Sequence, residues 1–156
     1  MKKILLMIIL IITLTTLNTA YAQSFPDINK DVSLQEAVGL LSSYKIMEGY
    51  PDGSFKPEKN VTRAEMAKIV TVAAGWFEYS KNMTSVYEDM SGHWAESYVE
   101  LANVLNIVKG ISPNKYGPDN LIRFEEAYTM VIRLLGYTDE SLGGNWPQNY
   151  YAKALE

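Results

Sequence analysis

The chain has 156 residues, of which 47% are hydrophobic, 12% aromatic and 21% charged, and it contains no cysteine. This length gives room for about one typical domain, which excludes a large multidomain enzyme for the sequence as given. Without cysteine there is no disulfide framework, zinc–thiolate site or cysteine nucleophile, and a single histidine, His93, excludes a multi-histidine metal site. The formal charge of −4 argues against a basic face for nucleic acid. We therefore expect no metal, no cofactor and no nucleic-acid partner.

Residues 1–22 show the order of features that a secretory signal peptide requires. Lys2 and Lys3 precede an apolar run over 4–14, and Ala20-Tyr21-Ala22 fits the small-residue pattern before a cleavage site. The apolar run is about 11 residues long, short of the roughly 20 that span a bilayer, which favours a signal over a membrane anchor. We expect a secreted mature chain that starts near residue 23 and makes no membrane contact. Without the two lysines it carries 12 basic and 18 acidic residues, a charge of −6.

Two units of about 60 residues repeat after the signal. Both open with an aromatic-x-Asp-apolar segment, at 25–28 and 87–90, and Gly49 and Pro57 recur 61 positions later as Gly110 and Pro118. We match 61–65 (Val-Thr-Arg-Ala-Glu) with 121–125 (Leu-Ile-Arg-Phe-Glu), an offset of 60 that implies the loss of one residue. The Trp, Tyr and Ala spacing that starts at residue 94 returns at residue 146. We divide the chain into a signal peptide (1–22), repeat 1 (23–80), repeat 2 (81–138) and a truncated repeat 3 (139–156).

Each unit is predicted to be helix, glycine-containing loop, helix. Ser-Leu-Gln-Glu at 33–36 and Thr-Arg-Ala-Glu at 62–65 have the spacing of a capping box, and apolar residues at helical intervals follow each of them. Gly75 and Gly136 stand where the second helices should end. Strand signals are weak, so the predicted fold is mainly α, built from tandem helix–loop–helix repeats.

These motifs resemble the S-layer homology family. The resemblance is carried by Phe-Pro-Asp at 25–27, His-Trp-Ala at 93–95, Gly-Tyr-Pro-Asp-Gly at 49–53 and Thr-Arg-Ala-Glu at 62–65, and it covers essentially the whole mature chain. It implies three modules packed around a pseudo-threefold axis, with grooves between neighbours. It also implies noncovalent attachment of exported proteins to secondary cell-wall polysaccharide, especially polymers with ketal-linked pyruvate, and hence a location at the cell wall. Repeat 1 lacks the Trp-Ala pair, and repeat 2 has Ile122 in place of the threonine.

A pyruvylated sugar offers a fixed carboxylate, which a guanidinium matches with two parallel hydrogen bonds. Arg63 and Arg123 are the candidate cations, since Arg63 lies in a first helical turn where unpaired N–H groups and the helix dipole favour an anion. The Pro-containing turn presents Gly53 and Ser54 as further candidate ligands. The opposing interpretation, that Arg63 pairs with an internal carboxylate, is open on spacing alone.

The other conserved-looking positions of the repeat divide between ligand contact and structure. Trp94 and Trp146 either stack on a sugar face or anchor the core. Thr62 and Glu65 are expected to form a helix cap, with Glu125 as the equivalent of Glu65 in repeat 2. Asp27 and Asp89 are expected to fasten the start of each unit by accepting backbone hydrogen bonds.

The sequence therefore favours a non-catalytic cell-surface binding module. One alternative is a glycosidase that uses Glu65 and Asp52, for which no second signal exists. Another is the anchoring part of a longer wall hydrolase or S-layer protein. A third is a self-associating envelope protein in which another chain covers the unfinished third unit.

Overall fold

The computed structural model describes residues 25–156, and the predicted signal peptide lies outside them. Helices follow one another along the whole of this range, and the described residues form only isolated β-bridges and no strand. The mainly α prediction is therefore confirmed. The elements are, in chain order, η1 (Pro26–Ile28), α2 (Val32–Ser43), α3 (Arg63–Ala73), η2 (Phe77–Tyr79), η3 (Glu88–Met90), α4 (Glu96–Val104), α5 (Phe124–Leu134), α6 (Asp139–Leu142) and α7 (Gln148–Ala154).

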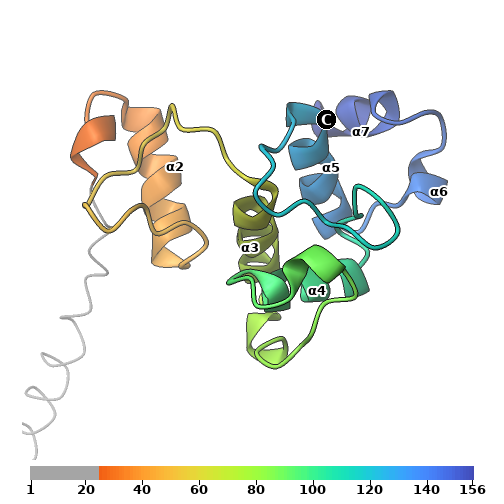
Figure 1. The fold of residues 1–156 in the computed structure, drawn as a ribbon. Helices are drawn as coiled ribbons and strands as arrows, with labels where there is room; N and C mark the ends of the chain where they lie inside the picture. Colours follow the sequence, from red (N-terminus) through yellow and green to blue (C-terminus); the bar gives the residue numbers. More distant parts are fainter. Residues whose placement is uncertain (1–24) are drawn as a thin grey trace, which may run out of the picture.

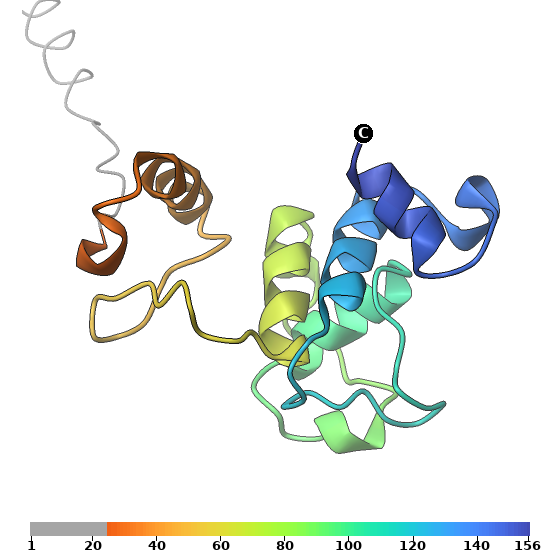
Figure 2. The same ribbon diagram turned by 90° about the horizontal axis from the view of Figure 1, so that it is seen from above.

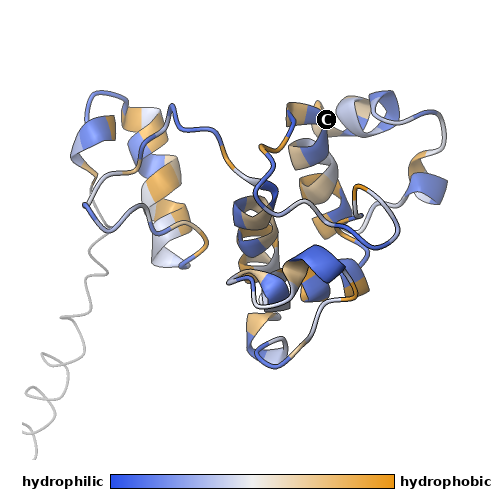
Figure 3. Ribbon diagram, viewed as in Figure 1, coloured by the Kyte–Doolittle hydropathy of each residue, from blue (hydrophilic) through white to orange (hydrophobic). Residues whose placement is uncertain are grey.

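The helices pack across repeat boundaries. The second helix of repeat 1, α3, lies against α4, the first helix of repeat 2, and α5 of repeat 2 lies against α7. Helix α2 stands to one side of this group in both views, joined to α3 by the long loop over residues 44–62 (Figures 1 and 2). Helices α2, α3 and α5 carry both polar and apolar residues, whereas the short helix α6 is almost wholly polar (Figure 3). The structural unit is therefore a pair of helices from two neighbouring sequence repeats.

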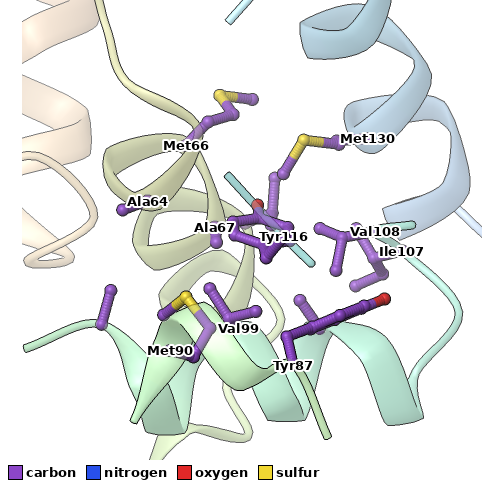
Figure 4. Close-up of a cluster of buried hydrophobic side chains, with 13 residues drawn as sticks. Ala64, Met66, Ala67, Tyr87, Met90, Val99, Ile107, Val108, Tyr116 and Met130 are labelled. Atoms are coloured by element: carbon purple, nitrogen blue, oxygen red, sulfur yellow. The ribbon is translucent and has the colours of Figure 1, made fainter. Parts of the chain in front are cut away.

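Two apolar clusters follow from this arrangement. The larger one joins α3, α4, α5 and the loop before α5, with Tyr116 fully buried at its centre among Ala67, Val108 and Met130 (Figure 4). The smaller one holds Phe25, Ile28 and Val38 around α2. Burial of apolar area contributes about 25 cal/mol per Å², so the larger cluster supplies most of the stability.

The repeated glycines mark close approaches of the opening aromatic residue to the loop. A Cβ atom at Gly49 would lie 2.3 Å from Cε1 of Phe25, and one at Gly110 would lie 2.6 Å from Cε1 of Tyr87. Real side chains do not tolerate such distances. Each repeat therefore needs glycine at this position so that its opening segment can pack on its own loop.

The helix caps correct two of the sequence predictions. Helix α2 is capped by Asp31, whose side chain accepts from the Leu34 N–H at 2.9 Å, and the 33–36 box does not form because the helix already starts at Val32. Helix α3 has the predicted box of Thr62 and Glu65. Helix α5 starts one residue later than expected: Arg123 is its N-cap residue and Glu126 its N3 residue.

This cap placement makes the repeat offset 61 throughout. Arg123 is equivalent to Thr62, and Phe124 is equivalent to Arg63. The predicted loss of one residue before the arginine is therefore wrong, and so is the predicted cap role of Glu125. The prediction matched Arg63 with Arg123 because both are arginine, although the spacing of the cap places Glu126 at the third helical position. Glu125 instead pairs with Arg123 at 3.2 Å.

Candidate functional site

A cleft of about 350 Å³ lies where the loop of repeat 1 meets α3 and the start of repeat 2. We call it cleft A. Its wall combines aromatic, cationic and apolar side chains, the composition of a polar-ligand site with an apolar face. It is lined by Ile46, Met47, Glu48, Gly49, Tyr50, Phe55, Lys56, Pro57, Lys59, Val61, Glu65, Lys68, Ile69 and Trp94.

A second cleft, of about 290 Å³, occupies the corresponding place in repeat 2. We call it cleft B. Many of its residues stand 61 positions after those of cleft A, for example Gly110 after Gly49 and Glu126 after Glu65, and Trp146 takes the place of Trp94. It is lined by Arg63, Ile107, Val108, Lys109, Gly110, Glu126, Thr129, Met130, Arg133, Asp139 and Trp146. The repeat thus builds the same hollow twice.

Arg63 lies in the wall of cleft B, and its guanidinium is already held by internal partners. Its Nη1 donates to Oε1 of Glu126 at 2.6 Å, its Nε to the Tyr116 carbonyl at 3.0 Å and its Nη2 to the Lys109 carbonyl at 2.8 Å. The guanidinium also lies over the Tyr116 ring, 4.6 Å from its centroid. The expected anion beside this cation is therefore present, but the protein supplies it, and a hollow remains beside the pair.

The backbone at the start of α3 is also occupied. The Arg63 N–H donates to the Asn120 carbonyl at 2.9 Å, and the Ala64 N–H donates to the Pro118 carbonyl at 3.0 Å. The Glu65 N–H donates to Oγ1 of Thr62. The predicted pocket of unpaired N–H groups at this helix start is therefore wrong, because the loop of repeat 2 closes it.

Arg123 lies outside the lining of both clefts, since it is a cap residue and not a residue of the first turn. Its side chain is 60% exposed and pairs with Glu125 and Glu126. Its guanidinium lies 5.6 Å from the Trp146 ring centroid. Arg123 therefore supports the rim of cleft B through Trp146 and is not equivalent to Arg63.

The two aspartates of the opening segments hold the loops that form the clefts. Asp27 accepts from the N–H groups of Phe55 and Lys56, and these bonds hold the pKa of its carboxyl below the ordinary value. Asp89 accepts from Tyr116 and Gly117 at 2.8 Å each. Desolvation raises the pKa of Asp89, but these two bonds outweigh it and the pKa lies below 3.8.

The tip of the repeat 1 turn is closed by two backbone hydrogen bonds, from the Tyr50 N–H to the Ser54 carbonyl and from the Gly53 N–H to the Tyr50 carbonyl, and by the side chain of Asp52. Asp52 accepts from Oγ of Ser54 at 2.5 Å and pairs with Lys56 at 2.6 Å. Gly53, with φ of +81°, and Ser54 lie beside cleft A and not in its lining. Asp52 and Glu65, the pair considered for a glycosidase, are both engaged, since Glu65 caps α3 and lies 3.7 Å from Lys59.

The two tryptophans stand at the rims of the clefts. The side chain of Trp94 is 57% exposed and that of Trp146 is 45% exposed, so neither is a core anchor. Trp146 is the more constrained, because its Nε1 donates to Oγ1 of Thr129 at 3.0 Å. Each ring is therefore placed where a ligand in the adjacent cleft would meet it.

The sequence analysis missed the lysines of cleft A. The ammonium groups of Lys56 and Lys59 lie 4.6 and 4.4 Å from the centroid of the Tyr50 ring, and Lys68 pairs with Glu48 at 3.0 Å. Hydrogen bonding to Tyr50 raises the pKa of Lys59. Their spacing in the sequence gives no sign that they share a cleft, because the loop brings them together.

In cleft B the lysines of cleft A are replaced by uncharged residues, and a different set of charged side chains forms a network around Asp139. Asp139 accepts from Lys109 at 2.7 Å, from Arg133 at 2.9 Å and from the Tyr150 hydroxyl. These three donors, Lys109 first, hold the pKa of Asp139 far below its usual range. The network ties α6 to α5 and α7.

A fold of paired helices with a cleft repeated in each sequence unit defines a repeat protein with more than one candidate binding site. The model of the S-layer homology domain matches residues 24–67 and 86–127, and the chain belongs to this family. The "Middle cell wall protein" of Brevibacillus brevis is 35% identical over 83% of the chain, and the "Surface layer protein" of Brevibacillus choshinensis is 33% identical over 81%. The "Cellulosome-anchoring protein" of Acetivibrio thermocellus is 28% identical over 72%.

These relatives are much longer than the region they share with the chain. The match covers 12% of each of the first two and 26% of the third. The names of the first two relatives refer to the cell wall and the surface layer, in agreement with the location expected from the sequence. Over residues 25–156, no helix combines the length and the apolar character that crossing a bilayer requires.

Proposed function

We propose that the chain is a non-catalytic module that attaches an exported protein to the cell wall by binding an acidic wall polysaccharide, such as one with pyruvylated sugars, without a covalent bond. The observation that carries the proposal is cleft A. There, three lysines, a tyrosine and an exposed tryptophan surround one hollow. A carboxylate on a sugar ring would meet cations at its acidic edge and an aromatic ring at its C–H face.

The lysines of cleft A are available for exchange of partners. Lys59 lies 3.7 Å from Glu65 and Lys68 lies 3.0 Å from Glu48, with the lysine side chains 48% and 33% exposed. Exposed ion pairs contribute about 0–1 kcal/mol, so replacing one by a bound carboxylate costs little. A charge-assisted hydrogen bond contributes about 1.5–3 kcal/mol, which supports net binding.

Cleft B is proposed as a second, weaker site. Arg63 and Trp146 line it, and the ligand roles expected for them remain proposals there. Arg63 is 7% exposed and its partner Glu126 is 20% exposed, so a sugar carboxylate would have to compete with a largely buried pair. Gly53, Ser54 and Arg123 are proposed as rim residues only. Two sites on one chain would add avidity on a polymer.

The test uses isothermal titration calorimetry to compare the affinity of the mature chain for two forms of the wall polysaccharide. One form is untreated, and the other has lost its pyruvate ketals by mild acid treatment. We expect binding to the untreated polymer and loss of most of it after the treatment. The mature chain, without residues 1–22, has a formal charge of −6, so any attraction to an acidic polymer has to be local to the cleft. We therefore expect the affinity to depend only weakly on salt concentration. Equal binding to both polymers would contradict the role of the acid, and binding to neither would contradict the proposal as a whole.

The variant that addresses cleft A is Lys59→Gln. We expect it to weaken binding of the untreated polymer about tenfold, the loss of one charge-assisted hydrogen bond. Lys81→Gln is the matched control, since Lys81 is 56% exposed, forms a surface pair with Glu78 and lies outside the lining of clefts A and B. Equal effects of the two variants would contradict the assignment of cleft A.

A further inference from the structure

A further hollow lies beside cleft A, between the end of α2 and the helices α3 and α4. This hollow, cleft C, has a volume of about 340 Å³, and its walls include Tyr44, Glu48, Lys68, Val72, Phe77 and Tyr98. Glu48 and Lys68 line both clefts. The side chains of Lys68 and Glu48 form a 3.0 Å ion pair and are 33% and 53% exposed, so the two hollows adjoin across a partly exposed ion pair, over which a glycan strand would have to pass.

A line of aromatic rings runs along the same path. The Trp94 ring, in cleft A, lies 6.3 Å from the ring of Tyr98, which in turn stacks on Phe77 at 4.4 Å with an angle of 8° between the planes. Tyr98 and Phe77 line cleft C, and each ring covers one face of the other. Tyr44 also lines cleft C and is 68% exposed, so its ring is the accessible one that suits the apolar C–H face of a sugar residue.

The two hollows differ in charge. Cleft A has three lysines against Glu48 and Glu65, an excess of one positive charge. Cleft C has Lys45 and Lys68 against Glu48 and Glu78, so its charges balance. An acidic sugar therefore fits cleft A, and a neutral sugar fits cleft C.

We propose that clefts A and C together bind two consecutive residues of one glycan strand, the acidic residue in cleft A and its uncharged neighbour in cleft C against Tyr44, Tyr98 and Phe77. This inference rests on the proposed function and adds to it a second sugar subsite. It predicts that the mature chain recognises the residue next to the acidic sugar as well as the acid itself.

The test is calorimetric binding of two probes: the methyl glycoside of a single pyruvylated sugar, and a tetrasaccharide with the same sugar at its end and neutral sugars behind it. We expect the wild-type chain to bind the tetrasaccharide at least threefold more tightly. Tyr44→Ala should weaken tetrasaccharide binding about 3- to 10-fold, the contribution of one aromatic contact, and leave binding of the methyl glycoside unchanged.

Tyr79→Ala is the control, because Tyr79 is 77% exposed and lies outside the lining of clefts A and C. Both tyrosines are exposed, so both variants should fold, which circular dichroism checks. If the methyl glycoside binds but neither chain length nor Tyr44→Ala changes the affinity, the second subsite is wrong and the proposed function stands. If neither probe binds, the proposed function itself fails.

Discussion

Clefts A and B occupy the same positions of two successive repeats, yet their charges are arranged differently. Arg63 of the preceding repeat lies in the wall of cleft B, and its guanidinium forms an ion pair with the carboxylate of Glu126. Among residues 25–156, no arginine enters cleft A in this way, and the equivalent Glu65 faces Lys59 at 3.7 Å. The comparison teaches that the chemistry of a repeated site depends on its neighbour in the fold as much as on its own motif.

The difference also separates stability from binding. In cleft B the nearly buried guanidinium of Arg63 joins the two repeats through the Tyr116 ring and the loop carbonyls. We call this group of contacts the Arg63 bracket. In cleft A the cations lie over Tyr50 at the surface. Arg63, the arginine within the motif that carries the family resemblance, is therefore chiefly a structural residue. The lysines of cleft A are the more accessible cations.

The largest effect that would test this comparison is on stability. Arg63→Ala removes the buried partner of Glu126, which keeps only the exposed Arg123 at 3.3 Å, and it leaves the carbonyls of Tyr116 and Lys109 without the guanidinium. We expect a loss of about 3–5 kcal/mol in the free energy of unfolding, measured by urea denaturation, as for the breaking of a buried ion pair. Arg123→Ala, the control on an exposed pair, should lose less than about 1 kcal/mol.

A loss for Arg63→Ala no larger than that for Arg123→Ala would show that the Arg63 bracket does not hold the repeats together. The double variant Arg63→Ala/Glu126→Ala should regain part of the lost stability, because no uncompensated carboxylate remains. Wall binding by Arg63→Ala is informative only where the folded fraction is measured in the same sample.

The two tryptophans should show the same difference, with Trp146 of cleft B contributing to stability and Trp94 of cleft A contributing to binding. Trp146→Ala removes the hydrogen bond to Thr129 and the contact with Arg123, so we expect a loss of about 1–2 kcal/mol in unfolding free energy. Trp94→Ala should leave stability within about 1 kcal/mol and weaken glycan binding about 10-fold. The opposite order of stability effects, or unchanged binding by Trp94→Ala, would contradict the division between the two clefts.

The smallest expected effect concerns the aspartates that fasten the two loops. The folded-state pKa of Asp89 lies below 3.8, so this carboxyl contributes stability above that pH and loses it as the pH falls through the lower folded value. We expect the midpoint of urea unfolding to fall below about pH 4 in the wild type and to change less steeply with pH in Asp89→Asn. Identical slopes would mean that Asp89 does not hold the Tyr116 loop. The same comparison with Asp27→Asn reports on the loop of cleft A.

The structure confirms several predictions that rest on local motifs, although the capping box predicted at 33–36 does not form. The box of Thr62 and Glu65, the glycine that follows each second helix and the acceptor role of the opening aspartates involve partners that the motif itself specifies. The register of α5 was misread because two arginines were aligned by identity. The spacing to the third helical residue, Glu126, would have placed the cap correctly.

The amino-acid sequence by itself determined the helices, the repeat and the family, because periodicity, caps and turn residues act over a few positions. Only the tertiary structure decided which cleft each side chain lines. Arg63 of repeat 1 lies in the lining of cleft B, and Trp94 of repeat 2 lies in the lining of cleft A. The physical reason is that the helices pair across the repeat boundary, so each hollow is lined by residues of more than one unit and no single motif contains it.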